Sequence, residues 1–218
     1  MAGSGFGGWI MDSTDTPTLE NPGTIDGLNF VKALRDQHRI IPNEADYNVA
    51  DMLFKDGHAG MIINGDWSWV DYRKAGIDFG VAPLPRITST GRWCGSMVSP
   101  KGFSINVNTG ETQRPWVIAL IRYLMLPENQ RESTEELLTM PTHLEIQHSE
   151  FVRQNEVLRN SRTAIDHGHP MPVVPALRAV WDAMRPSYQA VLAGTATAEQ
   201  AARDMQQRAL QRIKEMDE

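Results

Sequence analysis

Six tryptophans are the most unusual feature of this sequence, because an indole can bind a ligand as well as fill a core. They stand at positions Trp9, Trp67, Trp69, Trp93, Trp116 and Trp181. An indole offers a large apolar face and one N–H donor, and the C–H faces of a pyranose ring pack well on such a surface. Several indoles near glycine-rich turns and scattered polar groups favour a carbohydrate pocket. Burial of each indole in a core is the alternative, and the apolar helical segment around Trp116 predicts a core position there.

Other residues that could carry chemistry lack the partners that the chemistry needs. The next histidine after Cys94 is His143, so no base lies nearby in the sequence and an inert thiol is predicted. His167 and His169 supply only two of the ligands that zinc requires. The segment 12–15 (DSTD) lacks the glycine and the terminal glutamate of a calcium loop, so it is interpreted as a turn. No metal and no cofactor is expected, and a glycosidase carboxylate pair stays open because no pair can be chosen.

The composition bounds the class of protein. Of the 218 residues, 41% are hydrophobic and 22% are charged, which excludes a collagen-like or wholly disordered chain. The formal net charge is −6, whereas nucleic-acid binding normally needs a basic excess, so no nucleic-acid partner is expected. The first residues lack the positive and apolar segments of a signal peptide. We therefore expect either a cytoplasmic protein or a mature or truncated piece of an exported one.

Hydrophobic patterning predicts short strands that alternate with helices in an α/β fold. Glycine-dense residues 3–8 are expected to form a loop. Strands are predicted at 59–63, 79–82 and 103–107. Helices are predicted at 25–38 (with Thr24 as the N-cap), 49–56 (with Asn48 as the N-cap), 67–75, 114–125, 128–138, 149–159, 176–193 and 197–216. Prolines predict an extended connector at 170–175, and Thr197 with Gln200 forms a capping box for the last helix.

Several of these motifs occur together in one known family. The segment 62–69 (IINGDWSW), followed by 77–85 (IDFGVAPLP), resembles the central signature of the maltose-binding-protein-like solute-binding proteins. These proteins are the extracytoplasmic receptors of sugar ABC importers. The segments 102–106 and 171–181 fit the same family, and the similarity follows the same order over nearly the whole chain.

The resemblance implies a periplasmic-binding-protein-like α/β fold with two lobes that close over a ligand. It implies that Trp67, the first indole of the central motif, and Trp181, after the proline connector, stack on sugar rings. Arg185, one helical turn beyond Trp181, corresponds to a position that can reach a sugar hydroxyl.

Five further residues are implied to lie at or near the ligand. Gly65 and Asp66 are expected to shape the turn beneath the first indole, Gly95 and Ser96 to form the hinge-side wall of the cleft, and Trp9 to lie near the cleft. No catalytic residue is implied, so the protein is expected to bind sugar without being an enzyme.

The resemblance covers only the C-terminal half to two-thirds of such a receptor, so the first lobe is expected to be largely missing. Residues 1–98 and 146–218 then correspond to two segments of the second lobe, and 99–145 to an excursion into the first lobe. The apolar helix at 114–125 would be exposed, which predicts self-association, domain swapping or a partner chain, with a homodimer as the first expectation.

The resemblance implies a carbohydrate-binding component, of the maltose or oligosaccharide type, of an ABC sugar uptake system. Its partners would be the sugar and the permease subunits of the transporter, and its location periplasmic or extracellular. The alternative is a truncated fragment that binds no ligand and is stable only as a self-associated or swapped assembly.

Overall fold

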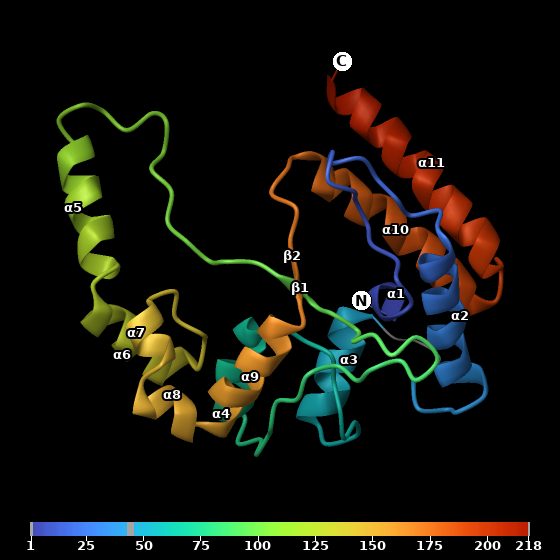
Figure 1. Cartoon of the computed structure of the whole chain (residues 1–218), viewed down its shortest axis with the longest axis horizontal. Helices are drawn as coiled ribbons and strands as arrows, with labels where there is room; N and C mark the ends of the chain where they lie inside the picture. Colours follow the sequence, from blue (N-terminus) through green and yellow to red (C-terminus); the bar gives the residue numbers. More distant parts are fainter. Residues whose placement is uncertain (1, 43–45, 218) are drawn as a thin grey trace. The chain divides into compact units, whose positions relative to one another are not determined.

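The structure is a computed structural model that describes residues 2–42 and 46–217. Helices account for most of the regular structure in these residues (Figure 1). The helices are α1 (Ala2–Gly5), α2 (Pro22–Asp36), α3 (Tyr47–Lys55), the 3-10 helix η1 (Asp66–Ser68), α4 (Trp69–Lys74), α5 (Arg114–Leu124), α6 (Pro127–Leu137), α7 (Leu144–Gln147), α8 (Glu150–Gln154), α9 (Glu156–Asp166), α10 (Ala176–Ala193) and α11 (Ala198–Asp217). The strands are β1 (Met97–Val98) and β2 (His169–Pro170).

The chain divides into two compact units, and it passes between them more than once. Unit 1 comprises Met1–Val49, Leu84–Val98 and His167–Glu218. Unit 2 comprises Ala50–Pro83 and Ser99–Asp166. The lobe segments 1–98, 99–145 and 146–218 refer to a larger receptor, and their assignment stays a prediction.

The core of unit 1 lies between α10, α11 and α2. Small residues on α11 let the two long helices approach closely, as Figure 1 shows for the orange and red ribbons. Nine buried residues form this core: Met11, Leu19, Leu177, Val180, Ala183, Val191, Ala201, Met205 and Ala209. Gln206 on α11 connects it to the N-terminal segment, because its side chain accepts a hydrogen bond from the Leu19 N–H (2.6 Å) and donates one to the Pro17 carbonyl (2.8 Å).

Local signals in the sequence predict the C-terminal helices well. Helix α10 has the predicted bounds, and Gly194 ends it with a φ of 75° in the left-handed region. The capping box before α11 is confirmed by reciprocal bonds. The Thr197 N–H donates to Gln200 Oε1 (3.0 Å), and the Gln200 N–H donates to Thr197 Oγ1 (3.2 Å).

The start of the chain differs from its predicted loop. Residues 2–5 form α1, which packs against α2, so the glycine-dense segment serves a close helix contact. Helix α2 begins at Pro22, earlier than predicted, and its N-cap is Asn21 and not Thr24. The Asn21 side chain accepts a hydrogen bond from the Thr24 N–H (2.9 Å). Proline at the first helical position and asparagine before it together explain the earlier start.

The three predicted strands at 59–63, 79–82 and 103–107 are wrong, since the structure has no strand in those residues. A short apolar run indicates an extended, buried segment, but a strand also needs a neighbouring segment to pair with. In the described residues the only sheet is the parallel pair of β1 and β2, with Met97 opposite His169 and Val98 opposite Pro170. The predicted connector at 170–175 therefore begins inside a strand.

Unit 2 holds two further departures from the predicted helices. The helix predicted at 149–159 is divided into α8 and α9 at Asn155, whose side chain caps the Leu158 N–H (3.1 Å). Helix α5 matches its prediction, but Trp116 is 78% exposed, so its predicted core position is wrong. Hydrophobicity alone could not show that this face of α5 lacks a packing partner among the described residues.

None of the helices in the described residues combines the length and apolar character needed to cross a membrane.

Candidate functional site

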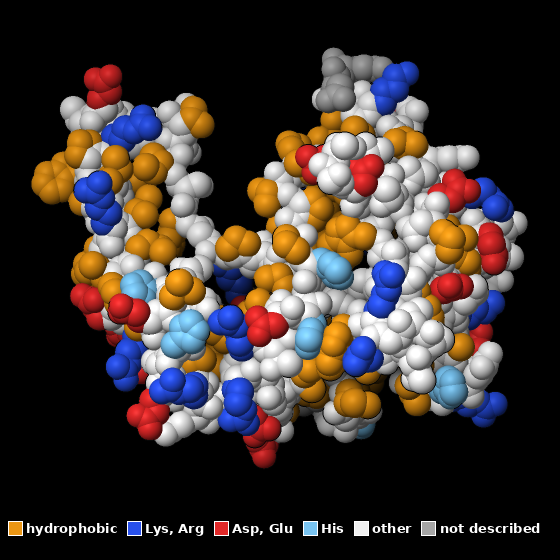
Figure 2. All heavy atoms as spheres, in the orientation of Figure 1, with side chains coloured by type: hydrophobic (Ala, Val, Ile, Leu, Met, Phe, Trp, Pro, Cys, Tyr) orange, Lys and Arg blue, Asp and Glu red, His pale blue; other side chains and the backbone are white. Residues whose placement is uncertain are grey.

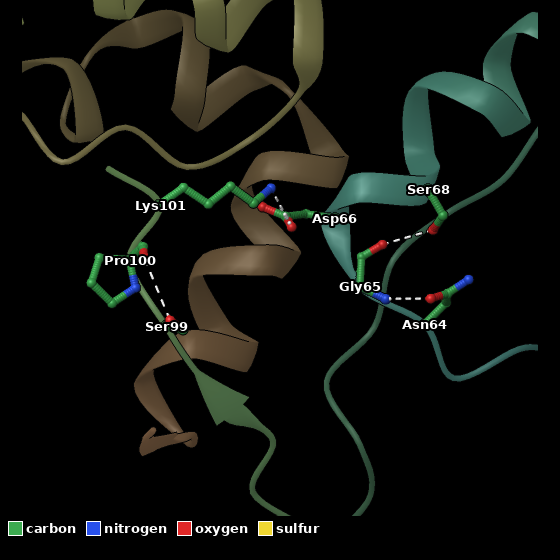
Figure 3. A network of polar contacts seen from close by, with 7 residues as sticks. All are labelled: Asn64, Gly65, Asp66, Ser68, Ser99, Pro100 and Lys101. Carbon is green, nitrogen blue, oxygen red and sulfur yellow. Dashed lines mark hydrogen bonds and ion pairs between the residues drawn. The ribbon is translucent and has the colours of Figure 1, made fainter. Parts of the chain in front are cut away.

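The turn at 64–68 presents the indole of Trp67. The turn follows an apolar segment and leads through η1 into α4, and Trp67 is 62% exposed. Ser68 closes the turn, because its hydroxyl (2.7 Å) and its N–H (3.2 Å) both donate to the Gly65 carbonyl (Figure 3). An indole that fills a core would be largely buried, so the exposure of Trp67 favours contact with a ligand.

Gly65 supports this indole from the backbone. A Cβ atom at position 65 would fall 2.1 Å from Trp67 Cζ3 and 2.2 Å from Cη2. The six-membered ring of the indole therefore lies directly against the Gly65 backbone. Any side chain at this position would displace the ring, so only glycine permits the observed orientation.

An ion pair adds charged groups to the same turn. Lys101 Nζ lies 2.8 Å from Asp66 Oδ1, and both side chains remain partly exposed (Figure 3). An exposed pair of this kind adds at most about 1 kcal/mol to stability. The pair places a carboxylate and an ammonium, both able to bond sugar hydroxyls, at the turn that carries Trp67. Lys101 could not be identified from the sequence, because it lies 35 residues beyond Asp66 along the chain.

The second indole of the predicted pair, Trp181, lies on α10 in unit 1 and is 44% exposed. It borders a groove of about 860 Å³ between the proline connector, the start of α10 and the end of α11. The Asp182 carboxylate and the Arg212 guanidinium form a 3.7 Å ion pair in this groove. Arg185 is exposed one turn further along α10, on the same face of the helix.

The remaining predicted residues gather around His169 in unit 1. The Trp9 ring packs on the His169 ring with centroids 4.6 Å apart. The backbone N–H of His169 donates a hydrogen bond to the Ser96 carbonyl (2.8 Å), and a Cβ at Gly95 would lie 2.6 Å from His169 Cδ2. The buried Ser4 hydroxyl donates to the Gly95 carbonyl (3.0 Å). These contacts fix the chain around β1 and β2, beside the points where it passes between the two units.

The histidine pair packs against aromatic rings. The His167 ring stacks on the Trp93 ring with centroids 4.2 Å apart and an interplanar angle of 12°, whereas the His169 and Trp9 rings are tilted by 43°. Among the described residues, no group of three or more His, Cys, Asp or Glu side chains is placed to hold a metal ion. Trp67 belongs to unit 2 and Trp181 to unit 1, so a crevice shared by the two indoles stays a prediction.

Cys94 is buried, with 7% exposure, and burial raises the pKa of its thiol. Because the thiolate is the reactive form, we expect the pH midpoint of alkylation by iodoacetamide to be higher for the folded chain than for the unfolded chain. Mass spectrometry of alkylation from pH 7 to 10 would show the midpoint displaced upward relative to the chain in denaturant. Equal midpoints in the folded and denatured chain would contradict this expectation.

Comparisons with known proteins show which proteins the whole chain resembles. The chain is 40% identical to the maltose/maltodextrin-binding domain MalE from Bdellovibrio bacteriovorus, solved bound to maltotriose, with a TM-score of 0.87 over 98% of this chain and 56% of that chain. It is 29% identical to the maltotriose-binding protein of Pyrococcus abyssi, over 86% of this chain and 41% of that protein. It is 24% identical to a maltooligosaccharide ABC transporter solute-binding lipoprotein of Streptococcus pneumoniae, over 94% of this chain and 48% of that protein.

The chain thus has the fold of maltose-binding proteins and spans about half the length of the curated relatives it matches. A family model described as bacterial extracellular solute-binding protein matches residues 2–160, which is most of the chain. The chain therefore belongs to the bacterial extracellular solute-binding proteins.

Proposed function

We propose that this chain is, or is part of, the carbohydrate-binding component of an ABC sugar uptake system, and that it binds maltose-type oligosaccharides without catalysis. The observation that carries the proposal is the exposed indole of Trp67, held against the Gly65 backbone. An indole in this position offers one apolar face to a flat ligand, and a pyranose ring has matching C–H faces.

Polar groups near each indole support the same chemistry. Asp66 and Lys101 form an ion pair at the turn that carries Trp67, while Asp182 and Arg212 border the groove beside Trp181. Carboxylates accept and ammonium or guanidinium groups donate hydrogen bonds, and such charged partners bond neutral hydroxyls strongly. A site that combines exposed indole rings with nearby charged side chains suits a ligand that is apolar on its ring faces and carries hydroxyls at its edges.

The relatives support the choice of sugar and of partners. Two of the matched proteins are named for maltotriose or are bound to it, and a third is a component of a maltooligosaccharide ABC transporter. By analogy, the partners of this chain would be maltose-type oligosaccharides and the permease subunits of a transporter, at the periplasmic or extracellular face of the membrane.

Calorimetric titration of the chain with maltotriose tests this proposal, and cellotriose, which has the same glucose units in β-linkage, is the matched control ligand. We expect saturable binding of maltotriose, weaker binding of cellotriose, and no shorter sugars after prolonged incubation. Absence of maltotriose binding would favour the non-binding assembly, and release of shorter sugars would favour a glycoside-processing enzyme.

A second proposal concerns association of two copies through α5. Trp116, Leu120 and Tyr123 recur at i, i+4 and i+7 and are all exposed, so they form one apolar stripe. Figure 2 shows hydrophobic side chains gathered over this helix. Such stripes commonly mark protein contacts. Light scattering should give the mass of a dimer, and Leu120→Asp should return it to a monomer, whereas the same charge at the exposed Gln189 of α10 should not.

A further inference from the structure

A chain of hydrogen bonds begins at a buried tyrosine below the turn that carries Trp67. Tyr72 on α4 is 2% exposed, and its ring is held edge-on by Phe54 (centroids 5.0 Å apart) and Phe79 (5.8 Å). Its hydroxyl donates to Asp51 Oδ1 (2.8 Å), and the other Asp51 oxygen pairs with Lys55 Nζ (2.7 Å). The phenol is therefore fixed both by packing and by a charged acceptor on α3.

Asn64 connects Tyr72 to the turn through two side-chain hydrogen bonds. Its side-chain NH₂ donates to the Tyr72 hydroxyl (2.7 Å), and its side-chain oxygen accepts from the Gly65 N–H (2.8 Å; Figure 3). Each end of the amide has a partner of the correct kind, so a flipped amide would lose both bonds. The orientation of Asn64, and with it the Gly65 peptide, is thus set by the buried phenol.

The Gly65 peptide is in turn the surface on which the Trp67 indole lies. The space where a Cβ of residue 65 would be is occupied by three ring carbons of Trp67, at 2.1 to 2.4 Å. Rotation of the Gly65 peptide would therefore move the ring or remove its support. The carbonyl of the same residue is held by Ser68, so both polar groups of Gly65 are bonded.

We propose that Asp51, Tyr72 and Asn64 are positioning residues for ligand binding, which act by fixing the Gly65 peptide under the Trp67 indole. This inference rests on the proposed function of Trp67 as a stacking platform. A ring that is already held in its stacking orientation loses less side-chain freedom when a ligand binds, and this preorganisation raises affinity roughly three- to tenfold.

A double-mutant cycle distinguishes positioning from general stabilisation. Asn64→Ala and Tyr72→Phe, which keeps the packed ring, should each weaken maltotriose binding roughly three- to tenfold, measured by calorimetry. In a Trp67→Ala background the same changes should cause no further loss, because they act through the indole. Tyr188→Phe on α10, whose side chain packs against the core of unit 1, is the matched control and should leave affinity unchanged. Equal losses in both backgrounds, or none in either, would overturn the proposal.

The orientation of the indole can also be measured without ligand. In a chain with ¹⁵N-labelled tryptophan, the Trp67 indole signal is the one lost in Trp67→Ala. We expect this signal to shift and to show greater motion in Asn64→Ala and Tyr72→Phe, as in the displaced-ring control Gly65→Ala, while the Trp116 signal stays constant. An unchanged Trp67 signal in the first two variants would overturn the positioning role, whereas wild-type affinity in Trp67→Ala would instead overturn the proposed function.

Discussion

Replacing Trp67 with alanine is expected to weaken maltotriose binding about thirtyfold. Stacking a sugar ring on the exposed indole removes roughly 80 Å² of apolar surface from water, which is worth about 2 kcal/mol. A loss of about 2 kcal/mol corresponds to a roughly thirtyfold rise in Kd, which isothermal titration calorimetry resolves. Because the indole is exposed, its removal should leave the thermal unfolding of the chain almost unchanged.

Trp116→Ala provides the matched control for this substitution. Trp116 is even more exposed than Trp67 and belongs to the same compact unit, but it lies on α5, outside the proposed site. We expect its removal to leave the Kd for maltotriose within twofold of the wild type. A similar loss of affinity in both variants would show that any exposed indole matters, and the assignment of Trp67 would then be wrong.

Gly23→Ala is expected to destabilise the chain by about 3 kcal/mol, the upper part of the usual range for overpacking. A Cβ at this position in the first turn of α2 would fall 2.2 Å from the Gly8 nitrogen and 2.8 Å from the Phe6 carbonyl oxygen. Both are backbone atoms, so the contact cannot be relieved by a side-chain rotation. The substitution should lower Tm by roughly 6–12 °C, measured by circular dichroism.

Helix propensity alone predicts that Gly23→Ala would raise the free energy of unfolding rather than lower it. Alanine is favoured over glycine in a helix by up to about 1 kcal/mol, so without the clash Gly23→Ala would raise stability. Gly3→Ala is the control within the same α1–α2 contact, because its Cβ would meet neighbours at an ordinary 3.5 Å. We expect little change in Tm for Gly3→Ala. A higher Tm for Gly23→Ala would mean that the backbone of residues 6–8, which follows α1, does not approach α2 as described.

Features that depend on residues close in sequence could be predicted. The bounds of α10, the capping box of α11 and the glycine that ends α10 follow from patterns within a few residues. The strands could not be predicted in the same way. Each apolar run was recognisable, but pairing depends on where distant segments lie, and in the described residues the only sheet is formed by β1 and β2.

The same distinction holds for the candidate site. The position of Trp67 at the end of an element followed from the Asn64–Gly65 turn dipeptide, which is local. The partners that hold the turn are distant in sequence. Asp51 accepts a hydrogen bond from Tyr72, which is bonded to the turn through Asn64, and Lys101, which follows β1 along the chain, pairs with Asp66. Charged and aromatic residues are common, so nothing in the sequence distinguished these from others of their type.

The role of Trp67 and Trp181 as stacking surfaces can be tested by titrating the ¹⁵N-tryptophan-labelled chain with maltotriose and following the indole signals in NMR spectra. If Trp67 and Trp181 are the stacking surfaces, their signals will shift with a common saturation curve, while those of Trp116 and the buried Trp69 stay in place. Saturable binding of maltotriose that leaves both the Trp67 and the Trp181 signals unmoved would show that the sugar binds elsewhere and that neither indole is a stacking surface.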